Sequence, residues 1–177
     1  MRLSATLGAL LITAVPSVTT AADLPVFTFQ GYNTEEVATA ESLATEPGMS
    51  GLKGCSTEND VTDCTNYQDP VIGGARTEWL MKRFYRGKLF YVFDSFRQFA
   101  LPDILAAFNA KYGPPSKIET RKWQSKAGAT YDNEVYVWQF KGGTLELSSM
   151  GQRVDEGSFE FVSTDNAPPP EPAKVDF

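Results

Sequence analysis

Residues 101–112 carry the pattern of an α-helix with one apolar side. Pro102 suits the first turn of a helix, and Asp103 favours the positive end of the helix dipole. Apolar residues recur at helical spacing and form one stripe: Leu101, Ile104, Leu105, Phe108 and Tyr112. The run Gly113-Pro114-Pro115 ends the helix. The sequence therefore predicts a helix whose stripe lies in the core of a domain.

Two segments before this helix predict a β-hairpin. Segments 78–85 and 88–94 flank Arg86-Gly87, which fits a two-residue turn. Counting outward from the turn places Phe84 opposite Leu89 and leaves apolar residues on both faces of the hairpin. Four of them share one face and form the candidate binding surface, namely Trp79, Met81, Phe90 and Val92. The alternative is that a second layer, such as a helix near Val37, covers this face.

Segments 134–141 and 144–149 predict a second hairpin around Gly142-Gly143. Counting outward places Phe140 opposite Leu145 and Trp138 opposite Leu147, which gives one apolar face and one mostly polar face. This two-sided pattern is typical of an antiparallel sheet that carries a helix on its dry side.

Weaker signals complete the predicted order of elements. Short strands are expected at 26–30, 71–75, 117–124 and 158–163, and a modest helix is expected from an Asn33 N-cap to about Ala44. The predicted fold class is α+β, an antiparallel sheet packed by one or two helices. The order of elements suggests a doubled plan, in which a helix is laid on several antiparallel strands in each half.

The amino terminus has the three parts of a secretory signal. Arg2 precedes an apolar run over residues 3–18, and Thr19-Thr20-Ala21-Ala22 supplies small residues for cleavage. The apolar run is shorter than the roughly 20 residues that a membrane span needs. The predicted division is a signal peptide over 1–22, a single α+β domain over 23–164 and a Pro-rich disordered tail over 165–177. The expected location is the periplasm or the outside of the cell.

The chain has two cysteines, Cys55 and Cys64, and an oxidising compartment predicts a disulfide between them. A redox-active pair normally has a two-residue spacer, which is absent here. The intervening segment 56–63 is polar without periodicity and is expected to be a loop. Its acidic and amide side chains could offer oxygen ligands to calcium, but the spacing is not that of an EF-hand, and a solvated loop is the preferred interpretation. No metal site and no cofactor are predicted.

The chain contains no histidine, which excludes Ser-His-Asp and Cys-His catalysis within this polypeptide. Carboxylate chemistry remains, and a glycosidase would need two acids that face each other across a cleft. The sequence offers acids that it cannot pair: Glu35, Glu36, Asp94, Glu134 and Glu146. The net charge of −6 and the predicted export argue against a nucleic-acid partner.

A run of motifs resembles small exported proteobacterial α+β proteins of uncharacterised function. These proteins show a helix that ends in Lys-Tyr-Gly-Pro, here Lys111-Tyr112-Gly113-Pro114, followed by a hairpin that bears a tryptophan, here Trp138 and Gly142-Gly143-Thr144-Leu145. Phe84-Tyr85-Arg86-Gly87-Lys88-Leu89 resembles the hairpin that leads into such a helix, and Trp123 also fits the pattern. The resemblance implies a fold and a compartment, but no activity.

At the level of architecture, the doubled plan with a disulfide in its first half is similar to beta-lactamase inhibitory proteins. No binding residue of that family can be matched in this sequence. The function expected from the sequence is that of an exported, non-catalytic interaction module with a protein partner in the cell envelope. The alternative is a carboxylate-based hydrolase that acts on an envelope glycan.

Overall fold

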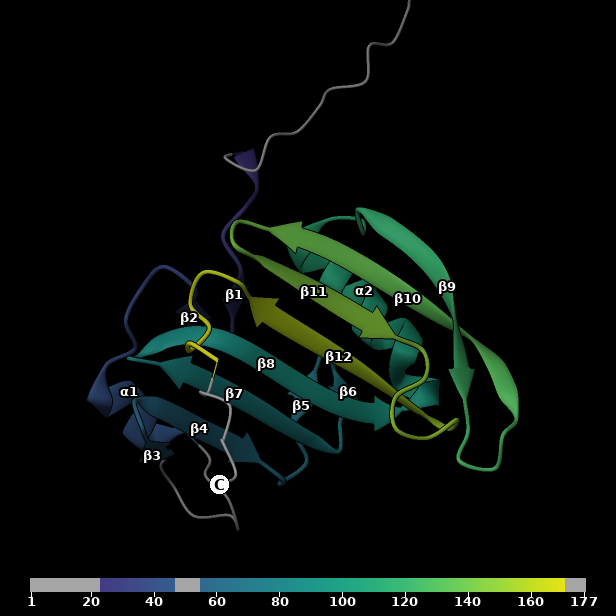
Figure 1. Ribbon diagram of the computed structural model, residues 1–177, viewed down its shortest axis with the longest axis horizontal. Coiled ribbons are helices and arrows are strands. Elements are labelled where there is room, and N and C mark those ends of the chain that lie inside the picture. Colours follow the sequence, from purple (N-terminus) through teal and green to yellow (C-terminus); the bar gives the residue numbers. More distant parts are fainter. Residues whose placement is uncertain (1–22, 47–54, 171–177) are drawn as a thin grey trace, which may run out of the picture.

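The computed structural model describes residues 23–46 and 55–170 (Figure 1). The predicted signal peptide lies outside these residues. The main sheet has eight antiparallel strands in the order β3-β4-β7-β8-β12-β11-β10-β9. Their bounds are Ser56–Glu58 (β3), Val61–Asn66 (β4), Trp79–Tyr85 (β7), Lys88–Arg97 (β8), Lys117–Gln124 (β9), Thr130–Phe140 (β10), Gly143–Ser148 (β11) and Glu156–Ser163 (β12). The antiparallel sheet of the predicted α+β fold is confirmed.

The remaining described elements are short apart from one helix. They are β1 (Thr28–Phe29), β2 (Tyr32–Asn33), α1 (Ala40–Thr45), β5 (Val71–Ile72), β6 (Ala75–Arg76), the 3₁₀ turn Gln98–Ala100 and α2 (Leu101–Tyr112). β1 pairs with β2, and β5 pairs with β6. In each half of the chain a helix comes before four strands of the main sheet, and β8 and β12 join the two halves. No described helix is long and apolar enough to cross a membrane.

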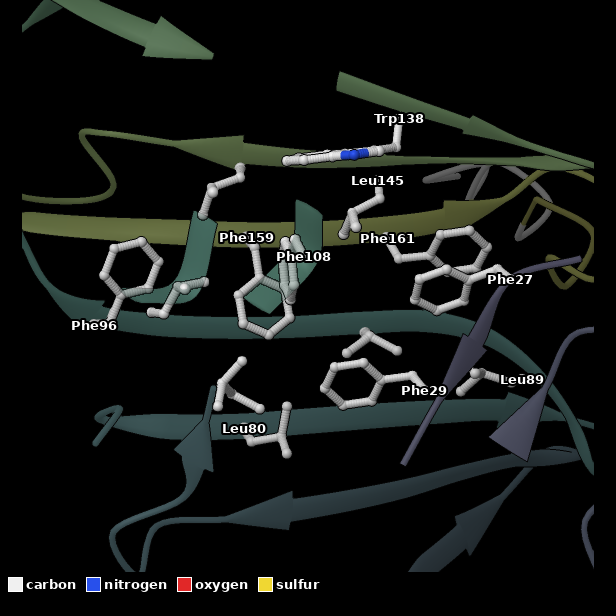
Figure 2. Close-up of a cluster of buried hydrophobic side chains, with 14 of the residues drawn as sticks. Phe27, Phe29, Leu80, Leu89, Phe96, Phe108, Trp138, Leu145, Phe159 and Phe161 are labelled. Carbon is white, nitrogen blue, oxygen red and sulfur yellow. The ribbon is translucent and has the colours of Figure 1, made fainter. Parts of the chain in front are cut away.

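One face of the main sheet, the core face, carries a continuous aromatic and aliphatic core (Figure 2). Phe108 of α2 lies in this core, with its ring 5.0 Å from that of Phe159 and 5.8 Å from that of Trp138. The indole N–H of Trp138 donates a 2.8 Å hydrogen bond to the carbonyl oxygen of Gly113, just after α2. Phe27, ahead of β1, stacks on Phe161 with 3.6 Å between the ring centroids. α2 spans Leu101–Tyr112, the same bounds that its sequence pattern predicts.

The helix predicted from Asn33 is wrong in its start. Asn33 Oδ1 accepts from the backbone N–H groups of Glu35 and Glu36, as an N-cap would, but α1 begins only at Ala40. The intervening backbone is bonded to the turn of the first hairpin instead, where the N–H of Ala38 donates 2.8 Å to the carbonyl oxygen of Gly87. A tertiary hydrogen bond thus replaces the helical one that the local pattern offered.

The predicted disulfide between Cys55 and Cys64 is present, but the segment inside it is not a loop. β3 and β4 form a hairpin there, with Asn59 and Asp60 both at positive φ, as a primed two-residue turn requires. The strand pattern was missed because all three residues of β3 are exposed, so no apolar alternation marks it. The turn residues Asn59-Asp60 were the available signal.

The second predicted hairpin is present with a different register. Trp138 lies opposite Leu145 and Phe140 opposite Gly143, because the turn is Lys141-Gly142 and Gly143 begins β11. A side chain at Gly143 would meet the ring of Phe161, since an added Cβ would lie 2.6 Å from it. The register differs by two residues from the predicted one, so every side chain keeps its predicted face.

The predicted tail begins with residues that are bonded to the domain. Asn166 Nδ2 donates to the carbonyl oxygens of Thr34 and Leu89 at 2.5 and 3.2 Å. Its backbone N–H donates to Ser163 Oγ at 3.2 Å. Residues 171–177 of the predicted tail lie outside the described residues.

Candidate functional site

The two faces of the main sheet differ in what lies on them. α2, β1 and the β5–β6 hairpin contribute Ile104, Phe29 and Ile72 to the buried cluster, so these elements belong to the core face (Figure 1). Side chains alternate along each strand, so the residues between the core positions point to the opposite side, here called the outer face. In one row across it, Met81, Phe93 and Glu160 lie on neighbouring strands.

A β-bulge in the first hairpin decides which residues reach the outer face. The pairing Phe84–Leu89 holds as predicted, but the register shifts between Arg83 and Phe84, and Arg83 then pairs with Tyr91. A shift of one residue turns every later side chain of one strand to the other face. Met81 therefore lies opposite Phe93, not Val92, and the register predicted beyond the bulge is wrong.

The four predicted site residues are consequently divided between the two faces. Val92 has no exposed surface and joins the core, where no partner could reach it. Trp79 and Met81 are partly exposed on the outer face. Phe90, the extra residue of the bulge, is buried outside the core cluster, with the Arg83 guanidinium 5.5 Å from its ring.

Three residues that sequence reasoning missed complete the surface. Phe93 packs on Trp79 with 5.0 Å between ring centroids, and Tyr67 stacks on the other side of Trp79 at 5.9 Å. Tyr91 lies beside Phe90 at 6.5 Å. We call the resulting surface the aromatic band, made of Tyr67, Trp79, Met81, Phe90, Tyr91 and Phe93. No local sequence pattern indicates the bulge that brings Tyr91 and Phe93 to this face.

The aromatic band is partly exposed except at Phe90, which is buried. Tyr67 is 53% exposed, and the exposure of four further side chains is intermediate, namely those of Trp79, Met81, Tyr91 and Phe93. Val162 of β12, 41% exposed, extends the band because it pairs with Tyr91. Burial and a hydrogen bond with the carboxylate of Glu160 raise the pKa of Tyr91 above its ordinary value.

The outer face of β9–β11 carries a network of ion pairs beside one aromatic contact, that of Trp123 with Tyr131. Arg121 bonds Glu146 through two nitrogens at 2.6 and 2.8 Å and also pairs with Glu119, and Lys117 pairs with Glu119 as well. The bond to Glu146 raises the pKa of Arg121 above its usual range. The outer face thus carries the aromatic band in one half and mainly ion pairs in the other, and the charges of these pairs neutralise one another.

The structure disperses the acids considered for hydrolysis. Glu35 pairs with Lys141 and Glu146 with Arg121, and Asp94 is buried on the core face. A groove of about 670 Å³ near the start of α2 holds two acids, Glu134 and Asp132, on one face of β10. Both are exposed, Asp132 is paired with Lys122, and Glu134 accepts a 3.0 Å hydrogen bond from Tyr136. This groove lacks the buried carboxyl that a glycosidase uses as its general acid.

Within the described residues, no group of three or more cysteine or acidic side chains could hold a metal ion. Comparison with known proteins returns no matching family model, no matching curated protein and no matching solved structure.

Proposed function

We propose that this chain is an exported, non-catalytic interaction module that binds a protein partner through the aromatic band. The observation that carries the proposal is the packing of Trp79 between Tyr67 and Phe93 on the outer face, with all three rings partly exposed. Such a ladder of aromatic rings covers a large area at little cost in side-chain entropy, and clustered aromatic residues dominate the binding energy of many interfaces.

The edges of the band suit a protein partner. Arg83 bonds Asp63 at 2.6 Å beside Phe90, so a charged pair borders the apolar centre. Protein interfaces commonly have an apolar centre with aromatic residues, methionine and arginine, surrounded by a polar rim. The hydrolase alternative is less favoured, because the acids of the groove beside α2 are exposed and already engaged.

Export is part of the proposal. The Cys55–Cys64 disulfide suggests an oxidising, extracytoplasmic compartment. The residues expected to direct export, 1–22, lie outside the described part of the chain. Intact-mass measurement of protein from cells should find a start near Asp23 and a mass two hydrogens below that of the reduced form. An uncleaved and fully reduced chain would contradict export.

The doubled plan and the similarity to small exported proteins also belong to the proposal. The strand order, symmetric about the β8–β12 pair, supports a doubled arrangement of helix and strands. In that arrangement α2 would pack on the sheet in the second half and α1 in the first.

Binding by the band is tested with the double variant Trp79→Ser/Phe93→Ser. Affinity capture from periplasmic extract, followed by purification of the recovered protein and titration, should show at least tenfold weaker binding by this variant, because it removes the centre of the ring ladder. The matched control is Gln139→Ser/Thr144→Ser, a pair on the outer face of the ionic half. Unchanged affinity of a correctly folded double variant, shown by its thermal unfolding, would overturn the proposal.

A further inference from the structure

β9 is a long edge strand. It lies at the end of the main sheet and pairs with β10 over eight residues without a register shift. Six of its eight residues are exposed, and the strand contains neither proline nor glycine. In the described residues no strand pairs with its other side, so a row of backbone N–H and C=O groups faces outward there. The opposite edge strand, β3, has only three residues.

The charges on β9 do not protect this edge in the usual way. Lysines on an edge strand normally discourage pairing, because an incoming strand would bury or oppose them. Here every cation of the strand is already paired within its own sheet. Lys117 pairs with Glu119, Arg121 with Glu119 and Glu146, and Lys122 with Asp132. An incoming strand therefore meets neutralised pairs rather than a positive row.

We propose that β9 pairs antiparallel with β9 of a second copy of this chain, in the register that places Thr120 opposite Thr120. A two-fold axis between antiparallel strands of one sheet runs perpendicular to that sheet, so one position must face its own copy. The alternation of side chains then keeps the outer faces of both copies on the same side.

The charge pattern of β9 favours this register over the two adjacent ones, which are centred on Glu119 and on Arg121. A pairing centred on Glu119 would oppose two glutamates and place Lys117 against Arg121. A pairing centred on Arg121 would oppose two arginines. The pairing centred on Thr120 places Glu119 of each copy opposite Arg121 of the other, which gives two attractive pairs and no like-charged pair.

The same register also covers the apolar side chains of the strand. Ile118, 60% exposed, would lie opposite Lys122, whose aliphatic stem can cover it. Lys117 would lie opposite Trp123, where an ammonium group can sit over the indole ring. The two copies would then form one continuous sheet with both aromatic bands on one face. The pairing does not depend on what the bands bind.

The first measurement is sedimentation equilibrium of the purified full-length mature protein over a wide range of concentration. The expected result is a rise from the monomer mass to twice that mass, without larger species, since the described part of each chain has one long unpaired edge strand. A protein that stays monomeric at its highest soluble concentration overturns the proposal.

The second measurement locates the interface and its register with single cysteines. Thr120→Cys places two thiols on directly opposed residues, whose Cα atoms lie roughly 4.5–5.5 Å apart, within reach of a disulfide. Lys122→Cys is the matched control, because it faces Ile118 and its two copies are too far apart to join. Under mild oxidation, Thr120→Cys should give at least about tenfold more cross-linked dimer than Lys122→Cys. Equal cross-linking of the two variants, or none with Thr120→Cys, contradicts the proposed pairing.

Charge variants provide an independent readout. Glu119→Arg opposes Arg121 of the other copy and should weaken dimerisation at least tenfold, whereas Glu119→Arg/Arg121→Glu restores opposite charges across the axis and should recover it. If the double variant does not recover dimerisation, although its thermal unfolding matches that of the single variant, this register is wrong.

Discussion

Thr77 Oγ1 donates a 2.7 Å hydrogen bond to Oδ2 of Asp94, a carboxyl group with no exposed surface. Asp94 lies on the core face of β8, between Leu80 and Phe159 of the neighbouring strands. Burial raises the pKa of Asp94 from 3.8 to about 8, although hydrogen bonds from Thr77 and from the backbone of Ser95 and Trp79 oppose the rise. The carboxyl therefore keeps its proton at neutral pH inside the folded protein.

The first prediction concerns the pH dependence of stability at Asp94. Between pH 3.8 and about 8 the folded state holds a proton that the unfolded state releases, so this group's contribution to the free energy of unfolding is largest in acid and falls as the pH rises. The amide side chain of the variant Asp94→Asn does not titrate, so its stability lacks this pH dependence. The difference in unfolding free energy between the protein and the variant should fall by up to about 1.4 kcal/mol per pH unit across this range.

Urea unfolding at a series of pH values measures this difference. Asp132→Asn is the control, because that carboxylate is exposed and paired with Lys122 at the surface. A difference between the protein and Asp94→Asn that stays constant from acid to pH 8 would rule out a buried, protonated Asp94.

The second prediction tests the faces that the bulge assigns. Val92→Thr places a hydroxyl in the core at nearly constant volume and should lower the unfolding free energy by about 1–3 kcal/mol. Val162→Thr, the same change on the exposed outer face, should stay within about 0.5 kcal/mol of the parent. Chemical denaturation of both variants decides the matter, and equal losses would mean that the two valines are not on opposite faces.

The third prediction concerns the ion pair between Lys82 and Glu46. The side chain of Lys82 is buried on the core face, burial lowers its pKa, and its ammonium also lies 5.2 Å from the ring of Tyr32. Glu46→Gln leaves a buried cation without a counter-charge and should cost about 3–5 kcal/mol of stability.

Glu35→Gln provides the comparison for this ion pair. It removes the partner of Lys141 in an exposed pair and should cost less than about 1 kcal/mol. Thermal unfolding of the two variants side by side gives the ranking, and a loss at Glu35 as large as that at Glu46 would refute the role of burial.

The fourth prediction concerns a close approach between β12 and β8. A Cβ added at Gly157 would lie 2.3 Å from the ring of Phe96, a fully buried side chain. Gly157→Ala should therefore destabilise the protein by about 1–3 kcal/mol through overpacking. Gly151→Ala is the control, since an added Cβ there has no neighbour nearer than 3.4 Å. A Gly157→Ala protein with parental unfolding temperature would show that Phe96 can move aside freely.

The sequence predicted the second hairpin better than the first. The reason is that the register error is two residues in the second hairpin and one residue in the first. In the second hairpin the turn is displaced, so the pairing of Trp138 moves by two residues and its face is kept. In the first hairpin the bulge moves the pairing of Met81 by one residue, so Val92 turns inward and Phe93 outward. Of the predicted surface, Trp79 and Met81 are therefore partly exposed on the outer face, Phe90 is buried at the bulge, and Val92 lies in the core.

The sequence alone determined the α2 helix, the disulfide and the existence of both hairpins. Each depends on residues close in the chain. The helix follows from the apolar stripe between Leu101 and Tyr112, the disulfide from the short spacing of the two cysteines, and the hairpins from turns flanked by alternating apolar residues. The tertiary structure alone decided the bulge beside Arg83, the pairing of β8 with β12 and the free edge of β9. Such features depend on contacts between residues far apart in the chain, as when Phe159 packs on Phe108 and Phe161 on Phe27, and no local pattern records which strands will pair.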